Sequence, residues 1–383
     1  MFSGKLSNNL GTRPKHISTF SSSCKSFVSL RPLSNLTITT LRNRDLERPS
    51  RTRSLETSYH TKLQQTQPQR RAFNSSHTMA ATPTNLTDAV VAAMKTLFPE
   101  ELADSAWDNT GLLLGQAPSS TPELKSNTVL LTNDLTSAVV DEALQEGAKM
   151  IVCYHPVIFR PLKSLTTKDP MQTQLLRLAA ERVSVYCPHT AMDAASGGLN
   201  DWLCDILLGG EHQLELKRTV TQPITSRALP EGHQGAGYGR AVELSQPISL
   251  HSVLKRLSTG LGDQRYMMVA IPPPSLLLPS SLAQRAITKV AVCAGSGAGV
   301  LKDATDAQVL VTGEMAHHDA LRHTQLGQVV VTVFHSNSER KYLEARLKPM
   351  LEVELETTAY ASTRVLVSKA DRDPFQVVDV WDC

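Results

Sequence analysis

The sequence predicts an α/β fold with two lobes, each built on a mostly parallel sheet with helices on its faces. Short apolar strands alternate with helices up to about residue 210, the pattern loosens over 211–285, and the alternation then resumes. Strand–helix–strand alternation of this kind is typical of parallel sheets. We therefore divide the chain into four parts: a leader at 1–78, a first lobe at 79–210, a connector at 211–285 and a second lobe at 286–383.

The first lobe begins with polar residues at 84–88, which offer N-caps to an apolar helix that reaches Phe98. Buried strands are then predicted at 128–133, 150–154 and 183–187. The predicted helices of this lobe lie at 137–146, 171–182 and 199–208. Gly147 ends the first of these three helices.

The connector is predicted to hold strands at 235–244 and 265–271, with a helix at 249–260 between them. A loop rich in Pro and Ser follows at 272–281. In the second lobe we expect strands at 289–293, 308–312 and 329–334, helices at 300–304, 315–327 and 338–351, and a closing strand at 353–360.

Residues 1–78 have the composition of a mitochondrial transit peptide. They hold 13 Lys and Arg against 3 Asp and Glu, and nine of the basic residues are Arg. The run Arg70-Arg71-Ala72-Phe73 resembles a matrix processing site. The alternative is a cationic tail with no targeting role. Met79 follows directly and can start a second product for the cytoplasm or nucleus.

The composition of the remaining chain excludes several classes of protein. It holds 26 basic and 33 acidic residues, a net charge of −7, which argues against a general nucleic-acid binder. No run of about 18 apolar residues occurs, so we expect no transmembrane span. The six cysteines form no C-x-x-C pair, and we expect reduced, buried thiols rather than disulfides or a zinc site.

Histidines and carboxylates follow several of the predicted strands. In open α/β sheets, functional sites form at the carboxyl ends of the strands. These strand ends carry Tyr154-His155, His189 with Asp193, Glu314 with His317 and His318, and His335 with Glu339 four residues later. Imidazole suits zinc, iron and manganese, and carboxylates can bridge two ions. The pattern therefore predicts a divalent-metal site, although the helix dipole alone also favours a Glu at the position of Glu339.

Six strings, taken together and in order, resemble the NIF-three-like family, named for interacting factor three of Ngg-one and also described as GTP cyclohydrolase I type 2 homologues. They are DNTGLLLG (108–115), YHPVIFRPLKSLT (154–166), HTAMDAASGGLND (189–201), CAGSGAG (293–299), TGEMAHHD (312–319) and FHSNSERKYL (334–343). The resemblance covers the chain from about 85 to 380.

The resemblance implies two related α/β lobes that face a cleft, a dinuclear metal site between them, and assembly into dimers or toroidal hexamers. Carried over by position, the family's metal ligands are His155, Asp193, His335 and Glu339. Tyr154 stands where the family has the first His of His-His-Pro. One ion is then held less tightly, or Tyr154 binds it as a phenolate or through water.

Several residues have weaker claims to a role. The glycine loop with Gly295, Ser296 and Gly297 offers backbone amides to a phosphate, or is a plain tight turn. His189 is expected to brace the Asp193 loop, and Glu314, His318 and Tyr154 are additional or outer residues of the metal site. Further expectations are Trp107 as packing at the cleft rim and Asn133-Asp134 as a helix cap. Arg160 and Lys163 either contact an anionic substrate or form an exposed basic face.

These inferences favour a hydrolase that uses one or two divalent ions, zinc, iron or manganese, to activate water for attack on a phosphate-bearing small molecule or nucleotide. The GTP cyclohydrolase activity rests on the resemblance alone, and no catalytic side chain is assigned. The alternative is a non-catalytic metal-binding scaffold with partners in transcription or other protein interactions; metal storage or delivery is a third. Fold does not decide among them.

Overall fold

The computed structural model describes residues 83, 85–116, 127–273 and 285–380, and these belong to one compact unit, His77–Cys383. The predicted leader at 1–78 and most of the predicted loop at 272–281 lie outside the described residues. In the described part, no helix is long and apolar enough to cross a membrane. The four cysteines described there, Cys153, Cys187, Cys204 and Cys293, are buried free thiols, as predicted.

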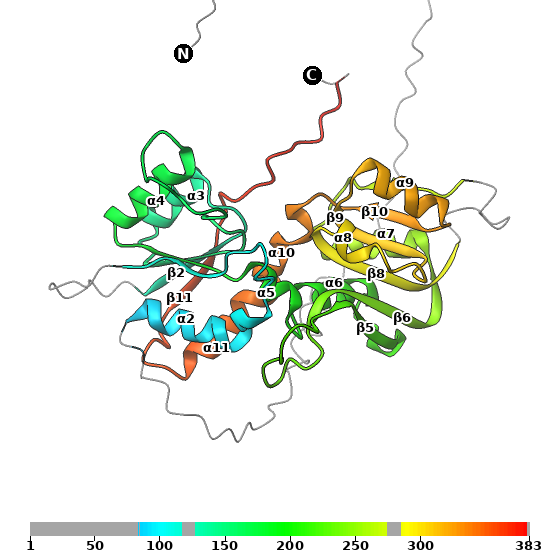
Figure 1. Ribbon diagram of the computed structural model, residues 1–383, viewed down its shortest axis with the longest axis horizontal. Helices are drawn as coiled ribbons and strands as arrows, with labels where there is room; N and C mark the ends of the chain where they lie inside the picture. Colours follow the sequence, from blue (N-terminus) through cyan, green and yellow to red (C-terminus); the bar gives the residue numbers. More distant parts are fainter. Residues whose placement is uncertain (1–82, 84, 117–126, 274–284, 381–383) are drawn as a thin grey trace, which may run out of the picture. The chain divides into compact units, whose positions relative to one another are not determined.

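The first sheet has the strand order β1-β4-β3-β2-β11. Its strands are β1 (Gly111–Leu114), β2 (Thr128–Thr132), β3 (Met150–Cys153), β4 (Ser184–Cys187) and β11 (Arg364–Val367). Four of them run parallel, and only β1 is antiparallel to its neighbour. β11 is the last strand of the described chain, yet it pairs with β2 near the beginning (Figure 1).

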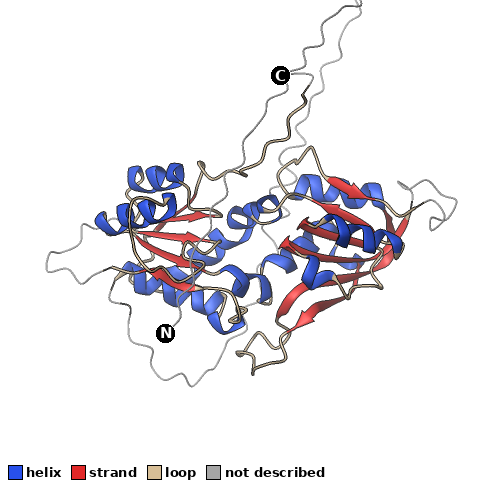
Figure 2. Cartoon of the chain, turned by 45° about the horizontal axis from the view of Figure 1, so that its top comes forward, coloured by secondary structure: helices blue, strands red, loops and turns tan. Residues whose placement is uncertain are grey.

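Helices cover both faces of this sheet (Figure 2). On one face α3 (Ser137–Gln145) and α4 (Pro170–Ala180) pack against Leu130 and Ile151. On the other, α2 (Leu86–Leu97) and α11 (Lys348–Glu356) pack against Val129 and Leu131. Because successive side chains of a strand point to opposite faces, an apolar run such as TVLLT needs cover on both.

The second sheet has the strand order β5-β6-β8-β9-β10-β7. Its strands are β5 (Glu215–Pro223), β6 (Gly237–Ser249), β7 (Met268–Ala270), β8 (Ala286–Ser296), β9 (Val309–Glu314) and β10 (Val329–Thr332). β8, β9 and β10 are parallel, and the other three pairings are antiparallel. Segment 211–285, expected to be a connector, thus supplies β5, β6 and β7 to this sheet.

The helices of this half are α5 (His189–Ala194), α6 (Leu199–Leu208), α7 (Leu250–Gly260), α8 (Ala298–Leu301), α9 (His317–Gln325) and α10 (Arg340–Tyr342), which continues through a π turn at Leu343–Leu347 into α11. Short 3₁₀ turns lie at Glu100–Leu102, His212–Leu214 and Ser336–Ser338. One apolar core runs from Val129 of the first sheet through Leu203 of α6 to Val290 of the second. The predicted α/β class with two sheets is confirmed.

The strand predicted over 353–360 is wrong, because this segment continues helix α11 to Glu356. The apolar residues Leu343, Leu347, Leu351 and Leu355 recur every four positions, and all four are buried. A spacing of four places side chains on one face of a helix. Val353, which suggested an alternating strand pattern with Leu351 and Leu355, lies off this face and is exposed.

Candidate metal centre

A cavity of about 650 Å³ opens at the carboxyl ends of the parallel strands of both sheets. Its lining comes from both halves of the described chain: Asp104, Trp107, Tyr154, His155, Pro156, Phe159, His189, Thr190, Asp193, Asn200, Gln222, Tyr238, Cys293, Ala294, Gly295, Ser296, Gly299, Val300, His335 and Glu339. Side chains placed at such strand ends are held by rigid elements and converge on one space. The cavity is therefore where the predicted strand-end residues meet.

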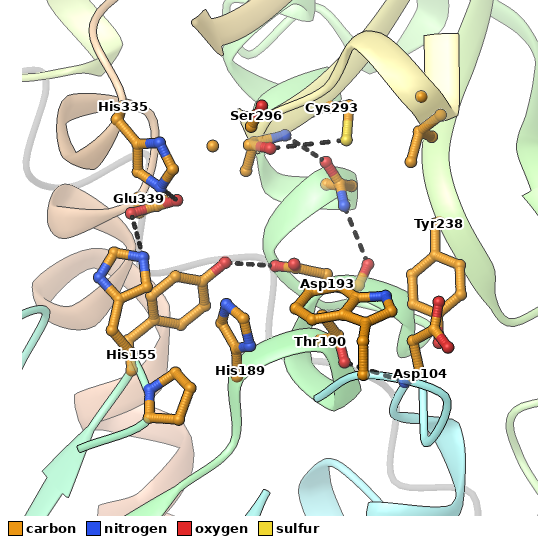
Figure 3. Close-up of a pocket in the computed structure, with 18 of the residues that line it drawn as sticks. Asp104, His155, His189, Thr190, Asp193, Tyr238, Cys293, Ser296, His335 and Glu339 are labelled. Atoms are coloured by element: carbon orange, nitrogen blue, oxygen red, sulfur yellow. Dashed lines mark hydrogen bonds and ion pairs between the residues drawn. The ribbon is translucent and has the colours of Figure 1, made fainter. Parts of the chain in front are cut away.

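Three of the predicted ligands form one cluster in this cavity (Figure 3). His155 follows β3, His335 follows β10, and Glu339 immediately precedes α10. One ligand atom from each residue lies within 4.8 Å of the other two. The Nε2 atoms of His155 and His335 each lie 3.5 Å from a different carboxylate oxygen of Glu339. Two imidazoles and a carboxylate at this spacing can hold a divalent transition-metal ion.

Each histidine of the cluster has a carboxylate behind it. The Nδ1 atom of His155 lies 2.8 Å from Asp134, and that of His335 lies 3.1 Å from Glu314. A carboxylate at Nδ1 fixes the proton there and leaves Nε2 as a lone-pair donor. Both Nε2 atoms therefore present lone pairs on the side of Glu339, which is the arrangement that metal coordination requires.

Glu339 is almost fully buried, and burial raises the pKa of its carboxyl well above the usual range. Its Oε2 accepts a hydrogen bond of 3.0 Å from the Asn133 side-chain amide. The Asn133 backbone N–H in turn donates to Asp371, whose carboxylate also lies 3.3 Å from Arg340. A bound cation would offset the cost of burying a charged carboxylate beside two imidazole lone pairs.

The glycine loop lies against this cluster, and two of its three predicted phosphate amides already have other partners. The N–H groups of Gly295 and Gly297 donate to Ser338 Oγ and Thr312 Oγ1, so neither is available to a phosphate. Ser296 lines the cavity together with Gly295. Gly295 has φ +59°, and a Cβ there would lie 2.7 Å from Glu339 Oε1. The role of this glycine is to leave room beside the cluster.

Asp193 lies in the same cavity but outside the cluster of three (Figure 3). Its Oδ1 accepts a hydrogen bond of 2.7 Å from the Tyr154 hydroxyl, and burial raises its pKa to about 6. Burial also raises the pKa of Tyr154 well above its ordinary value. The phenol is thus a neutral donor here, which disfavours a phenolate ligand.

His189 and His318 differ sharply in position. The Nδ1 atom of His189 lies 2.7 Å from the buried carboxylate of Asp108, and its ring lines the cavity between Tyr154 and Trp107. His318 is exposed on α9 with its ring against that of His317, and it does not line the cavity. The expectation that His318 belongs to the site is therefore not supported by its position.

The sequence of this chain is similar to those of known proteins that share one family. The sequence profile of the family described as Duf34/NIF3 (NGG1p interacting factor 3) matches residues 86–374. NGG1-interacting factor 3 of Saccharomyces cerevisiae is 39% identical over 295 residues, which cover 76% of this chain and 96% of the yeast protein. The chain belongs to the Duf34/NIF3 family.

A second Duf34/NIF3 relative supports the family assignment, and a solved structure supports the fold. The protein NIF3 homolog of Schizosaccharomyces pombe is 38% identical over 291 residues, 76% of this chain and 97% of that protein. A Bacillus cereus protein related to NIF3 superposes with a TM-score of 0.60 at 19% identity, over 76% of this chain and 98% of its own. The second likeness bears on the fold alone.

Two residues of this Duf34/NIF3 chain have roles that the sequence did not indicate. Asn133 and Asp134 were expected to cap the next helix, but their side chains contact Glu339 and His155. The N-cap of α3 is Thr136, which accepts a hydrogen bond from the Val139 N–H. Arg160 and Lys163, expected to meet an anionic substrate, are exposed and do not line the cavity.

Substitution of Thr136 tests whether this residue caps α3 and has no part in metal binding. Thr136→Ala should lower the free energy of unfolding by about 1 kcal/mol, the usual effect of losing an N-cap side chain. Metal content should not change, because the Thr136 side chain accepts from the first turn of α3 rather than from the cluster. Urea denaturation and metal analysis of the same preparation would test both statements, and a loss of metal would contradict the second.

Asp134→Asn should weaken metal binding roughly 10- to 100-fold, because the carboxylate behind a histidine ligand orients the ring and raises its basicity. Competition with a chelator would give the change in affinity. Asp141→Asn is a matched control, because Asp141 is exposed on α3 and pairs with Arg177 instead. Equal affinities for Asp134→Asn and wild type would show that His155 does not depend on this carboxylate.

Proposed function

We propose that this chain is a metal-dependent hydrolase. It binds one or two divalent ions, zinc, iron or manganese, and acts on a phosphate-bearing small molecule or nucleotide. A GTP cyclohydrolase I type 2-like reaction is suggested by family resemblance only. The observation that carries the proposal is the pairing of each cluster histidine with a carboxylate at Nδ1, which leaves two Nε2 atoms and Glu339 as a converging donor set.

The residues present fit a divalent ion. His155, His335 and Glu339 would hold the first ion, and Asp193 is the proposed additional ligand of a second. A bound ion would supply Lewis-acid polarisation of a phosphoryl or ring atom and activation of water. The elements β3 and β10 fix the two histidines, so the donor set is preorganised.

The Tyr154–Asp193 pair supplies a proton beside this donor set. The hydroxyl proton lies between Tyr154 Oη and Asp193 Oδ1, and the pKa of Asp193, raised to about 6, is close to neutral pH. A carboxyl group with such a pKa can both accept and return a proton during turnover. When no second ion is bound to Asp193, the pair can hold and transfer a proton at the cavity wall.

The same pair bears on the number of ions. Tyr154 occupies Asp193 as a hydrogen-bond donor, which should weaken a second ion there. Tyr154→His replaces the phenol with an imidazole lone pair and should raise the metal stoichiometry toward two per chain. Elemental analysis after reloading with Mn²⁺ would measure it, and a stoichiometry unchanged from wild type would argue against Asp193 as a ligand.

Activity itself requires a separate experiment. Full-length protein reloaded with Mn²⁺, Fe²⁺ or Zn²⁺ should cleave at least one member of a panel of phosphomonoesters, phosphodiesters and nucleotides. Glu339→Gln purified in parallel should lose that activity, which excludes a contaminating phosphatase. A protein that binds metal fully and cleaves nothing in the panel would contradict the hydrolase proposal.

The alternative is a non-catalytic metal-binding regulator that acts through protein partners. The name of the yeast relative, NGG1-interacting factor 3, favours this second function. If Glu339→Gln loses its metal but still binds protein partners, metal binding and partner binding are separate properties. If capture requires the ion and no substrate is cleaved, the scaffold becomes the better proposal.

Localisation and assembly are also proposed. Residues 1–78, with their 13 basic and 3 acidic residues, should direct a fused fluorescent reporter to mitochondria, and a diffuse signal would oppose this. Residues 79–383 should stay outside the organelle and sediment as a homo-oligomer, a dimer or hexamer. A monomer at micromolar concentration would contradict the assembly.

A further inference from the structure

A row of aromatic rings leads from the metal cluster to the rim of the cavity. Ring centroids are 5.3 Å apart for His335 and His155, 5.6 Å for His155 and His189, 5.8 Å for His189 and Trp107, and 5.9 Å for Trp107 and Phe159. Trp107 therefore lies within about 12 Å of His155, because the two intervening steps bound the separation.

Trp107 and Phe159, at the outer end of this row, are not buried as core residues would be. Trp107 and Phe159 are 50% and 48% exposed, although both line the cavity. Their two loops are tied together, since the Asn109 side chain donates to the backbone carbonyl of Ile158. Trp107 was expected to be packing. Instead, the half-exposed indole ring of Trp107 lies at the mouth of the cavity, where a flat ligand ring can stack on it.

The charge of the lining is the second observation. Three carboxylates, Asp104, Asp193 and Glu339, line the described cavity, and no Lys or Arg side chain does. Asp134 and Glu314 add negative charge behind the histidines. Proteins that bind polyphosphates surround them with Lys, Arg or amide groups. The described residues that line the cavity therefore offer no fixed positive charge to a polyphosphate, and the amides of Gly295 and Gly297 are already used.

We propose that the cavity selects a ligand with one flat heterocyclic ring and a single phosphate, such as a nucleoside monophosphate, and discriminates against the corresponding triphosphate. The ring stacks on Trp107 with Phe159 beside it, and the phosphate lies toward His155, His335 and Glu339. A volume of about 650 Å³ accommodates a ligand of this size. The proposal rests on the proposed function for the position of the phosphate, and it departs from the GTP activity implied by the resemblance.

Binding measurements on the full-length chain at fixed free Mn²⁺ would test this. Titration calorimetry should give a dissociation constant for guanosine monophosphate at least tenfold lower than for ribose 5-phosphate, which lacks the ring, and at least tenfold lower than for guanosine triphosphate. Trp107→Ala should bring the monophosphate to the level of ribose 5-phosphate, while Trp107→Phe should keep most of the preference. Tyr266→Ala is a matched control, because Tyr266 is also half exposed but does not line the cavity.

Triphosphate binding as tight as monophosphate binding, or an unchanged affinity in Trp107→Ala, would overturn the proposal. These readouts do not depend on turnover. If the predicted binding pattern appears and no ester is cleaved, the hydrolase proposal fails and the ligand assignment stands. If ribose 5-phosphate is cleaved and Trp107→Ala binds the monophosphate like wild type, the hydrolase proposal stands and the ligand assignment fails.

Discussion

Glu339→Gln should abolish metal binding while leaving the metal-free fold as stable as wild type or more so. Burial raises the pKa of this carboxyl, so a charged Glu339 is unfavourable in the metal-free protein. Glutamine keeps the shape and removes that charge, but it also removes the anionic ligand between His155 and His335. The variant therefore separates the effect of Glu339 on the stability of the metal-free fold from its effect on metal binding.

Thermal unfolding with and without Mn²⁺ would reveal the difference. An ion present at about a hundredfold excess over its Kd stabilises the wild type by roughly 2.7 kcal/mol, whereas the variant should gain almost nothing. Glu344→Gln is the matched control, since Glu344 is exposed in the π turn Leu343–Leu347 and does not line the cavity. A Glu339→Gln protein that binds Mn²⁺ as tightly as wild type would eliminate this cluster as the metal site.

Gly295→Ala should have the second large effect, a loss of both stability and metal. The backbone φ of +59° is unfavourable for an L side chain by about 1–2 kcal/mol. The new Cβ would also lie 2.7 Å from Glu339 Oε1 and 3.3 Å from His335 Nε2, within the space where an ion would bind. The cluster must then move apart, and its ligand atoms can no longer converge.

Gly299→Ala provides the comparison for this substitution. Gly299 borders the same cavity and lies in the short helix α8, and a Cβ added there would enter open space. Alanine at this position should keep the metal and raise stability by up to about 1 kcal/mol, because alanine favours a helix over glycine. Equal metal content in Gly295→Ala and Gly299→Ala would contradict the proposed crowding.

Much of the fold could be predicted because most of its elements have strong local patterns. The apolar runs that became β2, β3 and β10 are fully buried, and such runs predict strands wherever they occur. β1, β5 and β11 were not predicted, and the closing strand was placed at 353–360 instead of at β11. β1 is only four residues long, and β5 carries Lys217 and Arg218, whose side chains are exposed or paired with carboxylates rather than placed in an apolar row.

The three residues of the metal cluster could also be predicted from the sequence, but the contacts that Asn133 and Asp134 make with them could not. His155, His335 and Glu339 follow strands or precede a helix, so their convergence could be expected from strand-end positions and family resemblance. Asn133 and Asp134 could not be assigned, because Asn and Asp before a helix are ordinary capping residues. The Asn133 side chain meets Glu339, 206 residues further along the chain, only after the two halves of the fold have come together.

The position of β11 has a consequence for how the protein is made. This strand pairs with β2, and Asp371, which follows it, holds the backbone of Asn133. Synthesis proceeds from the N-terminus, so the first sheet lacks an edge, and Glu339 lacks a fixed Asn133, until nearly the whole chain has left the ribosome. Translation that stops between Glu339 and β11 would release a chain with all three metal-cluster residues but an open strand edge, which is a site for aggregation rather than for binding.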